Sequence, residues 1–417
     1  MGCPGQETEA WFFRRQRSLK AGLEKSGQRS TSRADVKVLF SLTLVHFMGD
    51  FYSSFINPLL PLFVERFALT LTEVGLITGI SRILAFIVQP SVGYMADRYQ
   101  GRLFIFSGLL LAILFIPMVG IAPSFPLLLL FISLGSIGAS MYHPPCAGMV
   151  STYAGRHFGL SMSVFILGGT LAFGVGPLFI AYYVQFNGLD ATPYTMILGL
   201  GVMVFLLITV PKPGREGFMN LGFMESIRKV LGAVWKPIAL LWVIMVLRAF
   251  VGQSFMTFIP VLYAREHYSL VSIGAMLSLF TVGGATSGLL AGHLSDRLGY
   301  KPIFFLTHGL ASFSLYLLLV LPGNWVYFNA FVAGFLVLAT LPLGVAMAQE
   351  LAPKGKSMVS SLMMGLAFGT GGLLTPLTGK LGDMFSIRPV LMVVAMVPLL
   401  TIALIGLLPG KSLKRVQ

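Results

Sequence analysis

The chain has 417 residues, of which 56% are hydrophobic by type and only 11% are charged, and its mean hydropathy is +0.84. A soluble globular domain carries about 25% charged residues because its outer face must be solvated, so this composition excludes a soluble globular protein and predicts that most of the chain faces lipid. The formal net charge is +14, and the position of those charges decides whether they imply a nucleic-acid partner.

Apolar stretches of at least about 18 residues predict membrane-spanning helices, and twelve such stretches can be counted along the chain. The expected fold is therefore an all-α integral membrane protein with 12 transmembrane helices. The predicted spans are 38–63, 72–94, 103–121, 126–150, 157–184, 193–210, 237–261, 270–292, 302–321, 324–349, 357–379 and 388–409.

The residues before the first span, 1–37, are polar and basic and contain no apolar stretch of signal-peptide type. We expect them to form a disordered cytoplasmic tail. The two cysteines, Cys3 in this tail and Cys146 in the fourth span, do not indicate a disulfide framework.

Span one carries a polar stripe in an otherwise apolar helix. His46 and Asp50 are four residues apart and share one helix face, and Asn57 lies seven residues further along nearly the same face. An ionisable group at bilayer depth costs at least about 2.5–3.5 kcal/mol, so it persists where it has a partner, a cavity or a function. We interpret Asp50, helped by His46, as the carrier of a coupling proton. The alternative is that Asp50 permanently neutralises a buried arginine.

Two arginines are candidates for that pairing, Arg82 in span two and Arg248 in span seven. At about 1.5 Å per residue, Asp50 and both arginines lie about 17–18 Å from one membrane face, near the middle of a core about 30 Å thick. Asp50 cannot fully pair with both, so one guanidinium group is left to bind an anionic head group. The alternative for either arginine is a bond to backbone carbonyls or a snorkelled position. Gln89 and Gln253 complete the polar faces of these two spans in the predicted substrate site.

Spans two and eight end in similar charged segments, GYMADRYQGR (93–102) and GHLSDRLGYKP (292–302). Glycine permits close helix approach, and a carboxylate can pair with arginines or cap a neighbouring helix at its positive N-terminus. Such contacts can form in one conformational state and break in another, although the charges could also act only as topology signals. The predicted gating residues are Gly93, Asp97, Arg98, Arg102, Gly292, Asp296 and Arg297.

Span four ends in MYHPP (141–145), where the histidine has two possible roles. His143 either bonds a backbone carbonyl freed by the two prolines, or it contributes to substrate binding, gating or proton transfer. His308 in span nine is interpreted as a packing residue. Span five reads GGTLAFGVGP (168–177), in which small residues followed by a proline permit tight packing and local bending.

A shift of 199 residues aligns the first half of the chain with the second. One register kept over separate segments indicates two related six-helix bundles, 38–210 and 237–409. They are joined by a basic cytoplasmic linker, 211–236, and followed by a short cytoplasmic tail, 410–417. The shift aligns Pro61 with Pro260, Gly75 with Gly274, Gly93 with Gly292, Asp97 with Asp296, Arg98 with Arg297 and Pro177 with Pro376.

The basic residues are concentrated on one side of the predicted membrane. Lysine and arginine are enriched in cytoplasmic loops of membrane proteins, so this bias places both termini in the cytoplasm and removes the need for a nucleic-acid partner. The six of the 29 that fall elsewhere are Arg66, Arg265, Lys380 and Arg388 in the outer loops and Arg82 and Arg248 within spans.

Two parallel six-helix halves are the architecture of major facilitator transporters. GYMADRYQGR resembles the signature that this superfamily carries between its second and third helices, and GHLSDRLGYKP resembles the weaker copy between helices eight and nine. The resemblance implies the major facilitator fold, with these segments in the cytoplasmic gate.

The first five spans resemble the fosmidomycin-resistance branch of that superfamily, through HFMGDFYSSFINPLLP (46–61), MYHPP (141–145) and GRHFGLSMSVFILGGTLAFGVGP (155–177). Members of this branch carry a carboxylate after the His-Pro pair, and here that position is Pro145, so a mechanism that uses that acid is in doubt. Span five is also similar to the antiporter motif of the superfamily, with Ala172, Gly176 and Pro177 matching and the trailing glycines missing.

These observations favour a monomeric secondary transporter of a bacterial inner membrane, which exports a small amphiphilic or anionic compound in exchange for protons by alternating access. The alternative is proton-coupled or facilitated uptake of an organic anion. The other classes considered are a polytopic membrane enzyme that uses His143 or the His46–Asp50 pair as a base, and a receptor that transports nothing. We expect no enzyme activity, no cofactor and no metal site, because the sequence has neither a phosphate-binding loop nor a Cys/His cluster.

Overall fold

The computed structural model describes residues 33–98, 101–155, 158–212, 232–352, 359 and 362–408, and every regular element in these ranges is a helix. Most of the predicted N-terminal tail, most of the linker and all of the C-terminal tail lie outside the described residues. The predictions of a disordered tail and of a cytoplasmic linker therefore stay predictions.

The first half of the chain forms one bundle of long helices. Its elements are α2 (Val36–Ser53), α3 (Ile56–Phe67), α4 (Leu71–Arg98), α5 (Gly101–Met118), the 3-10 helix η1 (Val119–Ile121), α6 (Phe125–Tyr153), α7 (Phe158–Asn187), the 3-10 helix η3 (Leu189–Thr195) and α8 (Met196–Thr209).

The second half forms the other bundle. Its elements are the 3-10 helix η4 (Gly232–Val234), α10 (Trp235–Arg265), α11 (Leu270–Leu298), α12 (Tyr300–Val320), α13 (Trp325–Leu338), α14 (Thr340–Leu351), the π-helix η6 (Leu362–Leu366), α16 (Ala367–Leu373), α17 (Thr375–Phe385), α18 (Ile387–Val394) and α19 (Val397–Leu407).

Eleven helical segments of the described residues are long and apolar enough to cross a membrane. They coincide with eleven of the twelve predicted spans. The remaining span, predicted at 357–379, is described at residue 359 and from 362 onwards, where it consists of η6, α16 and the start of α17. The described spans therefore agree with the expected number of about twelve, with one span built from shorter pieces.

Proline explains several of the breaks within spans. The first span is divided at Ser54 and Phe55 into α2 and α3, just before Pro58, which has no N–H to donate to a preceding carbonyl. Pro376 and Pro398 lie in the first turns of α17 and α19, where a missing N–H costs nothing. Three of the predicted spans are therefore interrupted within their bounds.

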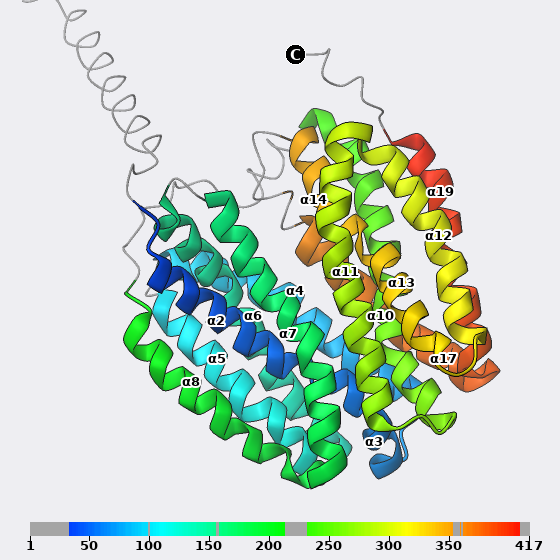
Figure 1. Cartoon of the computed structure of the whole chain (residues 1–417), viewed down its shortest axis with the longest axis horizontal. Helices are drawn as coiled ribbons and strands as arrows, with labels where there is room; N and C mark the ends of the chain where they lie inside the picture. Colours follow the sequence, from blue (N-terminus) through cyan, green and yellow to red (C-terminus); the bar gives the residue numbers. More distant parts are fainter. Residues whose placement is uncertain are drawn as a thin grey trace, which may run out of the picture.

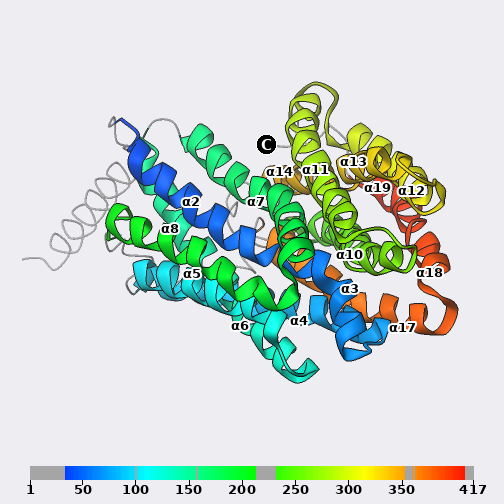
Figure 2. The ribbon, with the colours of Figure 1, turned by 60° about the horizontal axis from the view of Figure 1, so that its bottom comes forward.

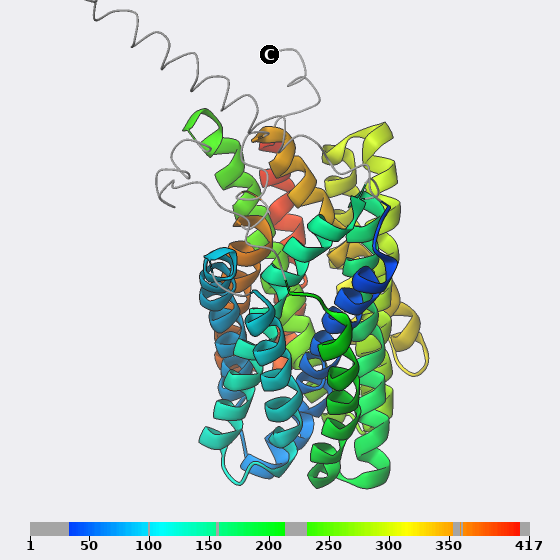
Figure 3. The same cartoon turned by 90° about the vertical axis from the view of Figure 1, so that its left-hand side faces the viewer.

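The two bundles stand side by side (Figure 1). The long helices of both bundles run between the same two ends of the molecule (Figure 3). We call the end where the described chain begins and finishes the terminal end, and the end that contains α3 the opposite end. Large apolar side chains such as Phe186, Ile197 and Ile208 remain exposed on the outside. In a chain of this composition these side chains form a lipid-facing surface.

At the opposite end the two halves meet through two glycine–proline contacts. A Cβ atom on Gly75 of α4 would lie 2.7 Å from Cα of Pro376, and a Cβ atom on Gly274 of α11 would lie 2.6 Å from the carbonyl oxygen of Pro177 in α7. The register of 199 residues relates these two glycines to each other and these two prolines to each other. The repeat is therefore used crosswise, because each half supplies the glycine for one contact and the proline for the other.

A polar contact reinforces this closed end. The carboxylate of Asp383 in α17 accepts hydrogen bonds from the backbone N–H groups of Leu71 (2.7 Å) and Thr72 (2.9 Å) and from the Thr72 hydroxyl (2.6 Å). It therefore caps the N-terminus of α4 across the boundary between the halves, where α4 and α17 pack against each other (Figure 2).

Candidate functional site

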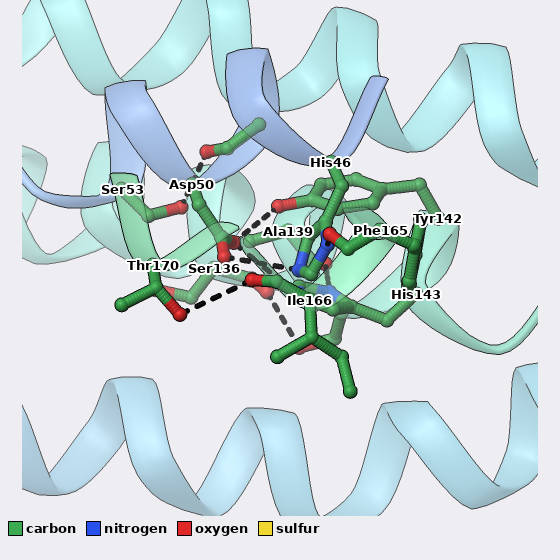
Figure 4. A network of polar contacts seen from close by, with 12 residues as sticks. His46, Asp50, Ser53, Ser136, Ala139, Tyr142, His143, Phe165, Ile166 and Thr170 are labelled. Carbon is green, nitrogen blue, oxygen red and sulfur yellow. Dashed lines mark hydrogen bonds and ion pairs between the residues drawn. The ribbon is translucent and has the colours of Figure 1, made fainter. Parts of the chain in front are cut away.

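A buried polar cluster joins α2 and α6 at mid-depth in the first bundle (Figure 4). Nε2 of His46 lies 3.2 Å from Oδ2 of Asp50, and Nε2 of His143 lies 3.3 Å from Oδ1 of the same carboxyl group. The hydroxyl of Tyr142 donates a hydrogen bond to Oδ1 of Asp50 at 2.7 Å. We call these four residues the Asp50 cluster.

The other ring nitrogens of both histidines face backbone carbonyls. Nδ1 of His46 lies 2.7 Å from the carbonyl oxygen of Phe165, and Nδ1 of His143 lies 2.6 Å from that of Ala139. A carbonyl oxygen can only accept, so we assign a proton to each Nδ1. Each Nε2 atom then has a lone pair and no proton, unless the ring is doubly protonated.

This assignment determines how many protons the Asp50 cluster holds. A bare Nε2 and a carboxylate oxygen are both acceptors, and two acceptors at 3.2–3.3 Å repel each other. Each of the two contacts becomes a hydrogen bond only when a proton lies in it, either on the imidazole or on the carboxyl group. The observed arrangement is therefore stable with two dissociable protons shared among His46, His143 and Asp50.

Small residues make room for the Asp50 cluster. A Cβ atom on Gly169 of α7 would lie 2.5 Å from Nε2 of His46 and 2.6 Å from Oδ2 of Asp50, and a Cβ atom on Gly49 would overlap the Tyr142 ring. The Phe165 ring stacks on the His46 ring with 4.3 Å between their centroids. Packing on three sides thus fixes the orientation of the His46–Asp50 pair.

Access to the Asp50 cluster is through His143. Its side chain is 30% exposed, whereas the side chains of His46 and Asp50 are 10% and 9% exposed. A proton that enters or leaves the cluster can therefore pass by the His143 ring. His143 faces the carbonyl oxygen of Ala139, which precedes the carbonyls that the two prolines free, so the predicted bond to a freed carbonyl is wrong for this conformation. His143 also faces the Asp50 carboxylate, and its role in substrate binding, gating or proton transfer stays a prediction.

His46, Asp50 and His143 are also a donor set that a metal ion could use, since their ligand atoms lie within 4.8 Å of one another. The sequence prediction of no Cys/His cluster missed this convergence because two of the ligands lie on α2 and the third on α6. In the structure the carboxylate oxygens of Asp50 contact both histidines and Tyr142 directly.

Arg82 and Arg248 both approach Phe368 of α16. Cζ of Arg82 lies 4.8 Å from the centroid of the Phe368 ring, and Cζ of Arg248 lies 5.9 Å from it. Arg82 extends from α4 in one half against Gly372 of the other half. Within the described residues the ion pairs of Asp50 go to the two histidines and none joins it to either arginine. The alternative that Asp50 neutralises an arginine by direct pairing is therefore wrong for this conformation.

The other predicted substrate residues are not drawn into one group. Asn57 lies in α3, beyond the break that follows Ser53, and no hydrogen bond joins it to the Asp50 cluster within the described chain. Gln89 is half-buried in α4, and Gln253 is buried in α10. Their roles in substrate binding stay predictions.

The predicted gating residues lie at the terminal end, in or beside α4, α5 and α11. The structure does not describe the surroundings of Gly93 or the side chains of Asp97, Arg98 and Asp296. Arg102 donates to the backbone carbonyl of Leu207 in its own half. A Cβ atom on Gly292 would meet no described atom within 4 Å, so the close helix approach predicted there is wrong for this conformation. Arg297 is exposed near the end of α11.

Sequence reasoning missed Tyr142, Gly49, Gly169 and Phe368 as site residues. Tyr142 was within reach, because it precedes His143 in the MYHPP segment and a buried tyrosine needs a partner for its hydroxyl group. The span-five pattern indicated that Gly169 lies at a close contact. Nothing in the sequence pattern indicates which glycine faces His46, or that Phe368 contacts two arginines.

Comparisons with known proteins agree with this architecture. A family model described as Major Facilitator Superfamily matches residues 42–357 and 241–415. The Fosmidomycin resistance protein of Escherichia coli (strain K12) is 28% identical over 389 residues, which cover 88% of this chain and 92% of that protein. The Quinolone resistance protein NorA of Staphylococcus aureus (strain MSSA476) is 22% identical over 338 residues, covering 79% of this chain and 84% of that protein.

Solved structures show the same fold. The structure of a bacterial homolog to the human lysosomal transporter Spinster, in its inward-facing and unoccupied conformation, aligns with a TM-score of 0.74 at 18% identity, over 89% of this chain and 96% of that one. Taken with the two-bundle fold, the matches show that the chain is a multi-pass membrane transporter that belongs to the Major Facilitator Superfamily.

Proposed function

We propose that this protein exports small amphiphilic or anionic compounds across a bacterial inner membrane in exchange for protons, as a monomer that works by alternating access. The observation that carries the proposal is the pair of contacts between the Asp50 carboxyl group and two histidine Nε2 atoms, each of which requires a proton. A cluster that gains or loses protons as the halves move can couple a proton gradient to transport.

The conformation supports a cycle with a defined order. With the terminal end in the cytoplasm, as the distribution of basic residues predicts, the glycine–proline contacts close the outer side of the membrane. Loss of protons from the Asp50 cluster removes the hydrogen bonds between α2 and α6, because the facing lone pairs then repel each other. In this scheme protons enter from outside and leave to the cytoplasm while the exported compound moves the other way.

The substrate class is supported by the two relatives and by Arg82. The names of those relatives associate them with resistance to fosmidomycin and to quinolones. Arg82 crosses the boundary between the halves at mid-depth, and its Nε is buried without a hydrogen-bond partner among the described residues. A guanidinium group in this position favours a carboxylate or another acidic oxygen. Arg248, Gln89, Gln253, Asn57 and His143 are proposed as further contacts to the compound.

Transport by the D50N variant in proteoliposomes tests the coupling. Purified protein is reconstituted with fosmidomycin as the probe compound, and accumulation is measured under imposed pH gradients of either sign. We expect Asp50→Asn to abolish accumulation against a concentration gradient, because the amide cannot take up the shared proton. Exchange of labelled for unlabelled compound without a pH gradient should persist, which shows that the variant still folds and binds.

The control is D190N, which alters an exposed carboxylate paired with Arg66. It should leave coupling unchanged, because exposed ion pairs contribute little. If D50N still concentrates the compound under a pH gradient, Asp50 does not carry the coupling proton. The sign of the gradient that drives wild-type accumulation separates export from the alternative of uptake.

A further inference from the structure

Both histidines of the Asp50 cluster are held in the way that metal-binding histidines are held. Nδ1 of His46 lies 2.7 Å from the carbonyl oxygen of Phe165, and Nδ1 of His143 lies 2.6 Å from that of Ala139. A carbonyl group behind one ring nitrogen fixes the tautomer and the orientation of a metal-ligating histidine. The two Nε2 lone pairs are thereby directed at one carboxyl group from two different helices (Figure 4).

The carboxyl group of Asp50 also has an orienting partner. The hydroxyl of Tyr142 donates to its Oδ1 at 2.7 Å, and Tyr142 is fully buried with its ring against Gly49. Carboxylate ligands of metal ions are hydrogen-bonded from outside the coordination shell in the same manner. All three candidate ligands are therefore oriented by their neighbours before any ion binds.

The separations between the candidate ligand atoms fit one small cation. Bonds of Zn²⁺ to nitrogen and oxygen are about 2.0–2.2 Å long, which places neighbouring ligands about 2.8–3.6 Å apart. The two observed separations between a histidine Nε2 and a carboxylate oxygen are 3.2 and 3.3 Å. The ligand atoms of His46, Asp50 and His143 all lie within 4.8 Å of one another. A shift of about 1 Å in the His143 ring, the most exposed of the three side chains, brings the third separation into the same range.

A coordinated ion needs no separate cavity at this position. Its short bonds place it against the ligand atoms, in the space that the shared protons occupy. Gly169 adds no side chain on the α7 side of the His46–Asp50 pair, where a Cβ atom would lie 2.5 Å from Nε2 and 2.6 Å from Oδ2. One dication that replaces two shared protons leaves the net charge of the site unchanged, so burial does not oppose the exchange.

We propose that His46, Asp50 and His143 form a binding site for one divalent transition-metal ion such as Zn²⁺. Imidazole nitrogens suit the late first-row metals, whereas Mg²⁺ and Ca²⁺ prefer oxygen ligands alone. The ion enters past the His143 ring, whose side chain is 30% exposed. Binding rests on the geometry alone. Competition between the ion and the coupling protons rests on the proposed function as well.

A cobalt titration of the purified protein tests the site. Full-length protein in detergent, with any polyhistidine tag removed, is titrated with cobalt chloride, and the visible absorption is followed. Cobalt held by a few protein ligands absorbs visible light much more strongly than hydrated cobalt. We expect a spectrum that saturates at about one equivalent of Co²⁺, is abolished by Zn²⁺ and is unaffected by a large excess of Mg²⁺.

Three variants assign the spectrum to these ligands. H143Q should abolish it, and H267Q should retain it as the matched control, because His267 is exposed and lies outside the Asp50 cluster. Y142F keeps all three ligands and loses only the hydrogen bond to Oδ1, so it should weaken the apparent affinity about tenfold.

A wild-type protein without this spectrum would overturn the site, as would a spectrum that persists in H143Q. If H143Q does not fold, zinc-soaked crystals of the wild-type protein decide the question. Anomalous density between the Nε2 atoms of His46 and His143 supports the site, and none there overturns it.

Calorimetry in buffers of different ionisation enthalpy separates this site from the proposed function. If the Asp50 cluster holds dissociable protons, bound Zn²⁺ releases them, and the measured enthalpy depends on the buffer. Binding without proton release would support the metal site and contradict proton storage by the cluster. Failure of Zn²⁺ and Co²⁺ to bind would overturn the metal site and leave the D50N test of coupling unaffected.

Discussion

At the scale of single residues, the Asp50 cluster depends on which atoms face each other. The spacing of four residues placed His46 beside Asp50 from the sequence alone, and the structure confirms that the two side chains are in contact. The sequence marked the MYHPP segment, but it could not show that His143 and Tyr142 approach Asp50, because that depends on how α6 packs against α2. The proton-carrying role of these residues stays a prediction.

Gly169 gives a test of the orientation of this pair. The substitution Gly169→Ala places a methyl group 2.5–2.6 Å from Nε2 of His46 and Oδ2 of Asp50, so the two side chains must separate. We expect pH-driven transport in proteoliposomes to fall about tenfold or more, which corresponds to about 1.4 kcal/mol, while the protein still folds.

The matched control is G148A on α6, where an added Cβ atom would meet no described atom within 4 Å. This variant should transport at the wild-type rate. Wild-type coupling in G169A would show that the spacing between His46 and Asp50 does not matter for transport.

At the scale of helices, α17 and α4 form a contact that a change of conformation must break. Partial burial by itself would raise the pKa of the Asp383 carboxyl group, but the hydrogen bonds from Thr72 and Leu71 outweigh burial and hold the pKa below its ordinary value. Asp383 lies beyond the predicted apolar segment, near the exposed end of α17. Its ionised form therefore favours closure of the opposite end.

The sign of the pH effect follows from this lowered pKa. Closure is fully favoured by Asp383 above the ordinary pKa of an aspartate, about 3.9, and this contribution is lost as the pH falls through the lower value of the closed state. We expect Asp383→Asn, which removes the charge at every pH, to shift the population toward opening at that end. Distances between spin labels on α4 and α17 would measure the shift at pH 7.

The control for this experiment is E73Q, which alters a neighbouring carboxylate on α4 that, among the described residues, bonds to Thr70 of its own half. It should leave the distance distribution unchanged. Identical distributions for D383N and wild type would show that this cap does not hold the two halves together.

At the scale of the whole molecule, the described close contacts between the halves lie at mid-depth and at the opposite end. Alternating access requires that end to open during each cycle. A cross-link between T72C and D383C should therefore stop transport, because the native side chains of these positions are already in contact at 2.6 Å.

A short bifunctional thiol reagent and proteoliposome transport measure this effect. We expect transport to fall to background after treatment of the double variant and to return after reduction. Each single-cysteine variant, treated in the same way, should keep its rate. Continued transport by the cross-linked double variant would contradict opening at this end.

The sequence predicted the architecture better than the site. Apolar length gave the spans, and the register of 199 residues gave the two halves, because both depend on patterns that every helix repeats. Gly75 and Pro376 were found as members of that register, but their contact was not, since it joins segments 301 residues apart. The interruption of the eleventh span leaves no periodic pattern in the sequence.

The crosswise glycine–proline contacts have a consequence for how quickly the molecule can change state. A glycine packed against backbone atoms makes few directional bonds, so the two bundles can rotate against each other through small angles with few hydrogen bonds to break. The resistance to rolling is then concentrated in a few polar groups, chiefly Asp383 and the Thr375 hydroxyl that donates to the carbonyl of Gly75. The turnover rate should therefore be adjustable by substitution of single polar side chains where the two halves meet, without any change to the apolar interior.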